Sequence, residues 1–167
     1  MLLQSHVEKL VESSEATVPE VERVLFKYSK VLPSSNAILA RLKYNLCGCY
    51  GRSEGYLLPD LNKKQLLRKR QLCEEVLSLL DTLQPGFSCR RGMILYEYHT
   101  ILLILGKMNL SSDKKSATED LRLSLKYLHE CLEILSLQSK STFPGKLFTA
   151  VNQTRSDIED FIQQSIL

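Results

Sequence analysis

Hydrophobic side chains recur at helical spacing along almost the whole chain. In an amphipathic helix such residues fall at positions i, i+3, i+4 and i+7, which collects them on one face. The segment from Asn62 to Leu83 shows this pattern most clearly, with an apolar face opposite an unbroken polar stripe. No segment alternates between apolar and polar residues for long enough to predict a strand. The pattern therefore predicts an all-α protein.

The segment from Pro85 to Gly106 is apolar on nearly every side of a helical wheel. Between Met93 and Leu105 only Glu97, His99 and Thr100 are frankly polar. A helix here has no broad polar face to turn to solvent, so it must be buried among other elements. Its apolar run is shorter than the roughly 20 residues that a membrane-spanning helix needs. We predict that this segment is the central helix of the core.

Capping residues and helix breakers divide the rest of the chain. A side chain that accepts from the first backbone N–H groups marks a helix start, and a Glu or Gln three residues later completes a capping box. Such pairs are Thr17 with Glu20, Asn62 with Gln65 and Ser116 with Glu119. The predicted helices are Leu2 to Glu12, Thr17 to Lys30, Asn36 to Gly51, Asn62 to Leu83, the central segment, Ser116 to Leu135 and Gly145 to Ile166.

These boundaries predict about seven helices joined mostly by short loops. Short loops favour antiparallel neighbours, so we expect hairpins stacked in series, tetratricopeptide-like but with longer helices and no regular repeat. The longer connection from Gly51 to Leu61 contains Tyr56, Leu57 and Leu58. Because a solvated linker would not carry three adjacent apolar side chains, we expect this loop to pack back on the helices.

Composition predicts a single intracellular domain covering residues 1–167. The chain has 167 residues, of which 44% are hydrophobic and 25% charged, and this suffices for one core. A net charge of +3 is too small to favour nucleic-acid binding. The amino terminus lacks the apolar run of a secretion signal. The five cysteines are scattered, which indicates reduced thiols. We expect a cytoplasmic or nuclear protein with no membrane or nucleic-acid partner.

The sequence offers no catalytic, cofactor or metal site. No Ser or Cys can be matched with a base, no glycine-rich phosphate loop is present, and Cys47-Gly48-Cys49 lacks a second pair of zinc ligands. Glu97 is the most interesting acid, because a carboxylate in an apolar helix can have a tuned pKa. A hydrogen-bonded or solvent-reaching Glu97 and a packed or rim His99 are the interpretations that we favour.

Five basic residues crowd the start of the helix predicted from Asn62. They are Lys63, Lys64, Arg68, Lys69 and Arg70. The macrodipole favours acids at a helix N-terminus, so stability alone does not explain this cluster. A surface for an acidic partner and a solvated, partly salt-paired face are both open. These residues are the candidate partner-binding site.

Several segments follow one another along the chain. They are Tyr50-Gly51-Arg52 with EGYLLPDL, then LLRKRQLCEEVLSLLDTLQPG, RRGMILYEYH and FPGKLFTAV. In this order they resemble the C-terminal region of the SET-and-MYND-domain (SMYD) protein lysine methyltransferases, particularly their arthropod branch. The likeness covers nearly everything from Leu32 to Phe161, although no single motif in it is a signature.

The resemblance implies a tetratricopeptide-like helical domain that packs beside a catalytic SET domain and helps to wall its substrate cleft. The S-adenosylmethionine site, the Asn-His-x-Cys motif and the zinc cysteines of that family have no counterpart here, so no catalytic residue is carried over. We expect a binding and scaffolding domain, without activity of its own, that belongs to such an enzyme. The alternative is a free-standing helical adaptor that binds an acidic peptide or protein.

Overall fold

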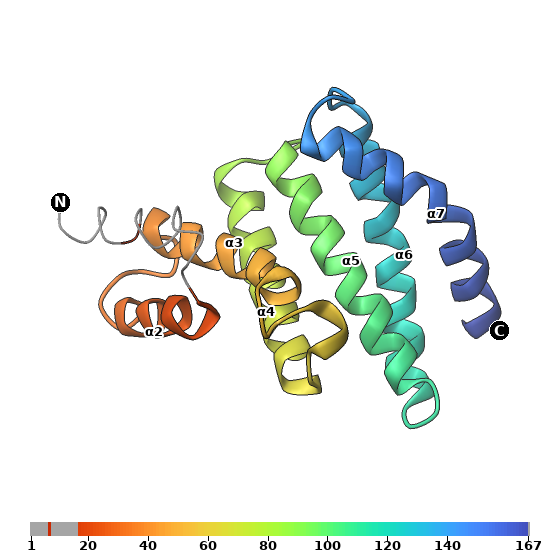
Figure 1. The fold of residues 1–167 in the computed structure, drawn as a ribbon, viewed down its shortest axis with the longest axis horizontal. Coiled ribbons are helices and arrows are strands. Elements are labelled where there is room, and N and C mark those ends of the chain that lie inside the picture. The colour runs from red at the N-terminus through yellow and green to blue at the C-terminus, as the bar shows by residue number, and fades with distance from the viewer. Residues whose placement is uncertain (1–6, 8–16, 167) are drawn as a thin grey trace. The chain divides into compact units, whose positions relative to one another are not determined.

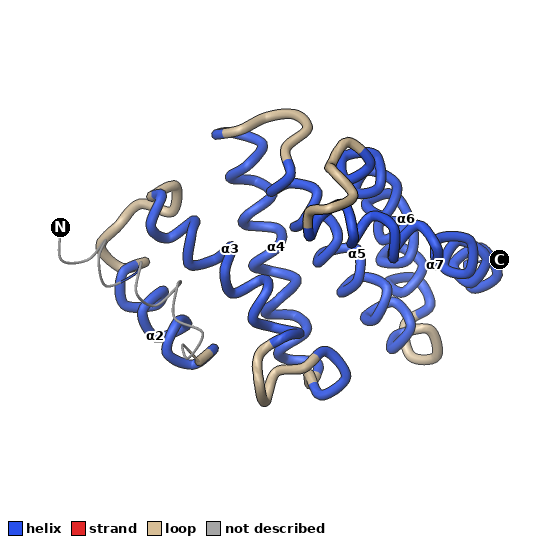
Figure 2. The backbone as a smooth tube through the Cα atoms, turned by 45° about the horizontal axis from the view of Figure 1, so that its top comes forward, coloured by secondary structure: helices blue, strands red, loops and turns tan. Residues whose placement is uncertain are grey.

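The computed structural model describes residue 7 and residues 17–166, and these are helical apart from their connections (Figure 2). The helices are α2 Val18–Tyr28, α3 Ala37–Arg52, the short 3₁₀ helix η1 Leu58–Asp60, α4 Lys63–Leu83, α5 Cys89–Asn109, α6 Lys114–Ser136 and α7 Phe143–Ile166. The predicted all-α fold is confirmed. The first predicted helix, Leu2 to Glu12, lies outside the described residues except for Val7.

The chain divides into two compact units, residues 1–79 and 80–167, and each is described by itself. The first contains α2, α3, η1 and most of α4. The second contains the last residues of α4 with α5, α6 and α7. The single domain expected over residues 1–167 stays a prediction.

Capping starts the helices of the first unit where the sequence predicts. The Thr17 backbone N–H donates to the Glu20 carboxylate at 2.9 Å, at the start of α2. At α4 the capping is reciprocal, because the Asn62 N–H donates to Gln65 Oε1 at 2.9 Å and the Gln65 N–H donates to Asn62 Oδ1 at 3.1 Å. These bonds satisfy N–H groups that a helix start leaves without intrahelical partners.

The end of α3 is kinked, and the loop after it folds back against the kink. Tyr50 and Gly51 leave helical geometry, and Gly51 has a φ of 119°, which glycine adopts without a Cβ clash. The Gly51 N–H donates to the Tyr56 carbonyl at 2.7 Å. The Tyr56 ring meets the Tyr50 ring edge-on, with 5.5 Å between centroids. The predicted packing of this loop is confirmed, although Leu57 remains exposed.

In the second unit α5, α6 and α7 run in alternating directions (Figure 1). The predicted burial of the central helix is confirmed, because most of its apolar residues and its polar residues Glu97 and His99 are buried. Glycine brings α5 close to α6 at two places. A Cβ on Gly92 would lie 2.9 Å from the Ile134 side chain, and a Cβ on Gly106 would lie 2.8 Å from that of Leu121.

The start of α6 differs from the sequence prediction. Asp113, not Ser116, is the N-cap, and its carboxylate accepts from the Ser116 N–H at 3.0 Å. Asp113 can form the N-cap because a carboxylate caps a helix as well as a hydroxyl does. Its negative charge also complements the helix dipole. At the other end of the unit, α7 contacts α6 through a small apolar cluster. Its buried members are Leu128, Leu132 and Val151.

Within residues 7 and 17–166, no helix combines the length and the apolar character that crossing a bilayer requires.

Candidate binding surfaces

The structure does not place the five predicted basic residues on one exposed face. Lys69 is 2% exposed, and its ammonium group donates to the carbonyl oxygen of Tyr50 at the kinked end of α3. That carbonyl lies where α3 departs from helical geometry, and Lys69 supplies a donor to it. Lys69 is therefore a structural residue, and its inclusion in an exposed basic patch is wrong.

Arg68 is held by an ion pair within the first unit. Its guanidinium binds both carboxylate oxygens of Glu22 in α2, at 2.8 and 2.9 Å. The Tyr50 hydroxyl donates to the same carboxylate at 3.1 Å. Burial, followed by the charge of Glu22, raises the pKa of Tyr50, whereas the hydrogen bond to Glu22 is the main cause of a raised pKa for Arg68. Glu22 thus joins α2, α3 and α4, and the charge of Arg68 is largely neutralised.

The other three basic residues lie at the helix surface. Arg70 pairs with Glu74 one turn later, with 3.0 Å between Nε and Oε1. Lys63 and Lys64 are exposed in the first turn of α4, which contains no acid. A partner-binding role at this helix start stays a prediction, and it now depends on Lys63 and Lys64.

The sequence did contain a signal for the burial of Lys69. Position 69 lies three residues after Leu66 and four before Cys73, both of which are buried on the apolar face of α4. Helical spacing therefore places Lys69 on the core side. The signal was missed because charged residues are almost never fully buried unless they are paired.

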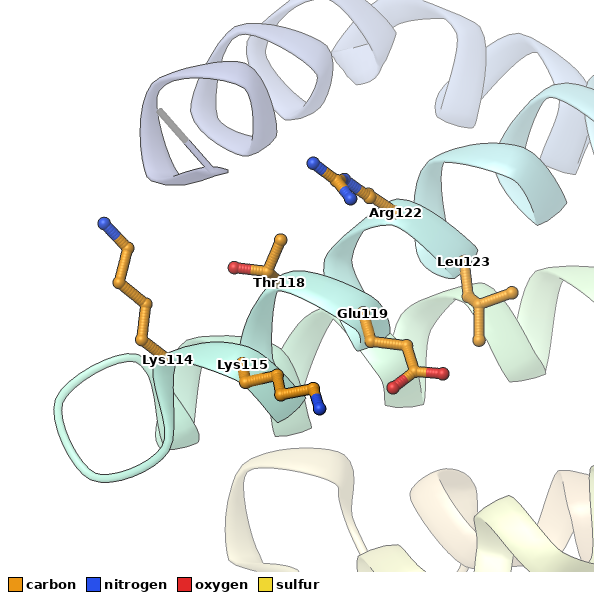
Figure 3. A pocket seen from close by; sticks show the side chains of 6 residues that line it. All are labelled: Lys114, Lys115, Thr118, Glu119, Arg122 and Leu123. Carbon is orange, nitrogen blue, oxygen red and sulfur yellow. The ribbon is translucent and has the colours of Figure 1, made fainter.

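A second cationic surface lies on α6, and the sequence analysis did not single it out. A hollow of about 530 Å³ lies along the first three turns of the helix. Figure 3 shows the side chains that line it. Its lining residues are Lys114, Lys115, Thr118, Glu119, Arg122 and Leu123. Glu119 is the one acid in this lining set, so the hollow carries a net positive charge.

The cations of α6 follow helical spacing. Lys114, Thr118 and Arg122 are four residues apart and point to the same side of the helix (Figure 3). Lys126, one turn further, continues this row and is also exposed. The row spans about 18 Å at 1.5 Å per residue. It could have been found from the sequence as three bases and no acid at every fourth position.

His99 in α5 and Ser124 in α6 form a buried polar pair. The Ser124 hydroxyl donates to the His99 carbonyl at 3.0 Å, and His99 Nδ1 lies 2.8 Å from the same hydroxyl oxygen. The hydroxyl proton is committed to the carbonyl, so Nδ1 carries a proton and donates to Ser124. Burial lowers the pKa of His99 to about 4. This arrangement is a neutral helix-to-helix contact rather than a nucleophile with its base, and the packed interpretation of His99 is confirmed.

The remaining chemically interesting groups are also buried. Glu97 is 6% exposed, which excludes the solvent-reaching interpretation of its position. Burial raises the pKa of the Cys131 thiol to about 12, so this cysteine is a poor nucleophile. In the part of the chain that the structure describes, no three His, Cys, Asp or Glu side chains are grouped so that they could hold a metal ion.

Comparisons with known proteins found no matching family model and no matching curated protein.

Proposed function

We propose that this chain is a helical binding and scaffolding domain of the type that forms the C-terminal region of SMYD protein lysine methyltransferases. The observation that carries the proposal is the position of the resembling segments in the fold. They fall on residues that build the scaffold rather than on scattered surface positions.

The first two resembling segments meet at the kinked end of α3. Gly51 provides the kink, Tyr56 accepts from the Gly51 N–H, and Lys69 donates to the Tyr50 carbonyl. The segment RRGMILYEYH lies in α5 and contains Gly92, whose missing side chain lets α5 approach α6. A resemblance carried by such residues supports a shared helical scaffold.

In this proposal the domain positions partners and performs no methyl transfer. The resemblance implies that it packs beside a SET domain and helps to wall the substrate cleft. The S-adenosylmethionine motif of that family has no counterpart in the sequence. The domain would therefore act through its surfaces, in cis on a SET domain or in trans on another protein.

Isothermal titration calorimetry with S-adenosylmethionine tests the absence of activity. We expect no binding heat from the purified chain, and micromolar binding would contradict the proposal. Sequencing the transcript upstream of Met1 tests the family assignment independently. SET and MYND sequences in the same reading frame would support the proposal, and a stop codon shortly upstream would favour a free-standing adaptor.

A free-standing adaptor for an acidic segment is the second candidate, and the cationic row on α6 favours it. Lys114, Arg122 and Lys126 offer three charges along about 18 Å beside a hollow that can take side chains. An acidic peptide laid along this row would meet positive charge at every turn or second turn. Lys63 and Lys64 at the start of α4 are the competing location.

Fluorescence polarisation of a labelled octaglutamate peptide distinguishes the two locations. If α6 is the site, Lys114→Glu with Arg122→Glu abolishes binding, and Lys63→Glu with Lys64→Glu leaves it unchanged. The opposite result assigns the site to α4. Each double variant is the charge-matched control for the other. Binding of the unaltered chain should weaken as salt shortens the Debye length below about 10 Å. A peptide that does not bind at low salt would contradict the adaptor.

A further inference from the structure

Four large apolar side chains are exposed at one end of the second unit. Leu83 is 61% exposed, Phe87 60%, Leu137 68% and Phe143 62%. Single exposed hydrophobic residues are common on protein surfaces, but a group of them in one region marks an interaction site. We call these four residues the apolar end.

The path of the chain brings them to the same end. Leu83 closes α4 and Phe87 lies just before α5 begins at Cys89. Leu137 follows the last residue of α6, and Phe143 begins α7. Because α5 and α7 start where α6 finishes, both connections lie at one end of the three-helix unit (Figure 1).

The two connections are positively charged. Residues 83–90 and 137–147 contain Arg90, Lys140 and Lys146 and no Asp or Glu. Arg90, Lys140 and Lys146 are all exposed. Three acids lie just outside these segments. Asp81 and Glu130 both pair with Arg91, and Glu133 is exposed about one turn before the end of α6.

The location and the charge together restrict the occupant. The hollow on α6 starts at Lys114, at the opposite end of that helix, so the apolar end is a separate surface. A second copy of the chain would bring like charges together, which opposes self-association. A bound peptide helix needs a groove along its length, whereas Phe87 lies in the connection before α5 and Phe143 is the first residue of α7. Exposed apolar side chains with cationic side chains near them fit a flat anionic surface.

We propose that the apolar end docks on anionic lipid membranes. Phe and Leu side chains enter the boundary between headgroups and acyl chains, and nearby Lys and Arg side chains bind acidic headgroups. Such contact is reversible and peripheral, and it requires no spanning helix. It departs from the expectation, drawn from sequence alone, that the protein has no membrane partner. It does not depend on the SMYD assignment.

A single tryptophan reports the insertion directly, because the chain contains no natural tryptophan. We expect the emission of Phe87→Trp to shift to shorter wavelength with vesicles of phosphatidylcholine containing about 30% phosphatidylserine, and not with pure phosphatidylcholine. Phe26→Trp is the matched control, since Phe26 is 65% exposed but lies in α2 of the other unit. Its emission should stay unchanged with both vesicles.

Vesicle flotation tests the two contributions separately. We expect Phe87→Ser with Phe143→Ser to reduce vesicle binding at least tenfold, and Phe26→Ser to leave it unchanged. Lys140→Glu with Lys146→Glu should reduce binding at least fivefold, since each base near an anionic surface contributes about 1 kcal/mol, or about fivefold. Lys27→Glu with Lys30→Glu, two exposed lysines of the other unit, is the charge-matched control. Thermal midpoints establish that the variants are folded.

Three results would overturn the proposal. The first is an unaltered chain that does not float with anionic vesicles. The second is equal binding to neutral and anionic vesicles, which would remove the role of the cations. The third is a tryptophan shift at position 87 with an acidic amphipathic peptide but not with vesicles, which would assign the apolar end to a protein partner. The first two use chains without substitutions, so they decide the matter even if a variant misfolds.

Discussion

At the scale of single residues, the two groups of lysine in α4 have opposite roles. Lys69 points its alkyl chain into the core and donates to the Tyr50 carbonyl, whereas Lys63 and Lys64 lie exposed in the first turn. A lysine that lies on the apolar stripe of its helix is tolerated in the core because a carbonyl oxygen satisfies its ammonium group.

The first prediction compares these positions. Lys69→Met keeps much of the volume but removes a donor from the Tyr50 carbonyl, so unfolding free energy should fall by about 1–3 kcal/mol. Lys63→Glu with Lys64→Glu should leave stability unchanged or slightly raised, because acids complement the helix dipole. Urea unfolding followed by circular dichroism measures both. Equal stability of Lys69→Met and the unaltered chain would show that the buried ammonium group has no structural role.

The second prediction concerns His99 and pH. Its pKa is lowered by burial from an ordinary 6.5 to about 4, so the unfolded chain binds a proton that the folded chain excludes. The stability from the neutral ring is fully present above pH 6.5 and is lost as pH falls from 6.5 to about 4. The gap corresponds to at most about 3 kcal/mol.

Urea unfolding at pH 7, 6, 5 and 4.5 measures this loss. Carboxylates also titrate in this range, so the informative quantity is the difference between the unaltered chain and His99→Asn, whose amide can still donate to Ser124. We expect the variant to lose less stability on acidification. Identical slopes for the two proteins would refute the assignment to His99.

At the scale of elements, glycine decides how closely two helices approach. The third prediction is that Gly106→Ala destabilises the protein by about 1–3 kcal/mol, since its Cβ would lie 2.8 Å from the packed Leu121 side chain. Gly48→Ala in α3 is the control. The three atoms nearest to its Cβ all belong to the long side chain of Arg52, which can shift, so helix propensity should raise stability by roughly 0.5–1 kcal/mol. We expect the thermal and urea midpoints to fall for Gly106→Ala and to rise for Gly48→Ala.

The helices were predictable because their signals are local. The caps at Thr17, Asn36 and Asn62 and the apolar character of α5 are read from residues within one or two turns of each other. The cap at Asp113 was missed because Ser116 with Glu119 fits the same rule three residues later. A local rule cannot choose between two adjacent caps that both satisfy it.

The candidate sites were less predictable because they depend on contacts distant in sequence. Arg68 is neutralised by Glu22, 46 residues away. The apolar end is formed by two connections on either side of a helical hairpin, and each alone is an ordinary turn. The row on α6 did have a local signal, which is a base at positions 114, 122 and 126 on one helical stripe.

At the scale of the whole molecule, the chain divides into two compact units, and a substitution in the second one tests whether they unfold together. The fourth prediction is that Leu102→Asp unfolds the protein, because Leu102 is fully buried and an unpaired buried charge costs several kcal/mol. Met108→Asp in the same helix is the control, since Met108 is 47% exposed.

Hydrogen exchange measured by mass spectrometry shows which parts of the chain the Leu102→Asp substitution unfolds. If residues 1–167 form a single domain, amides in α3 and α4 lose protection together with those in α5 and α6. Protection that persists in residues 37–79 would show that the first unit folds by itself. An unchanged thermal midpoint would instead place α5 at the surface and contradict the architecture.

The two close contacts of α5 with α6 also fix its position along the helix axis. Gly92 faces Ile134 and Leu135, and Gly106 faces Leu121, fourteen residues or about 21 Å further along. If α5 slid by one turn, larger side chains would meet both places at once. The two contacts therefore fix the axial register of α5 against α6. It sets the separation between the apolar end and the start of the hollow on α6, so any partner that contacts both must match a fixed length.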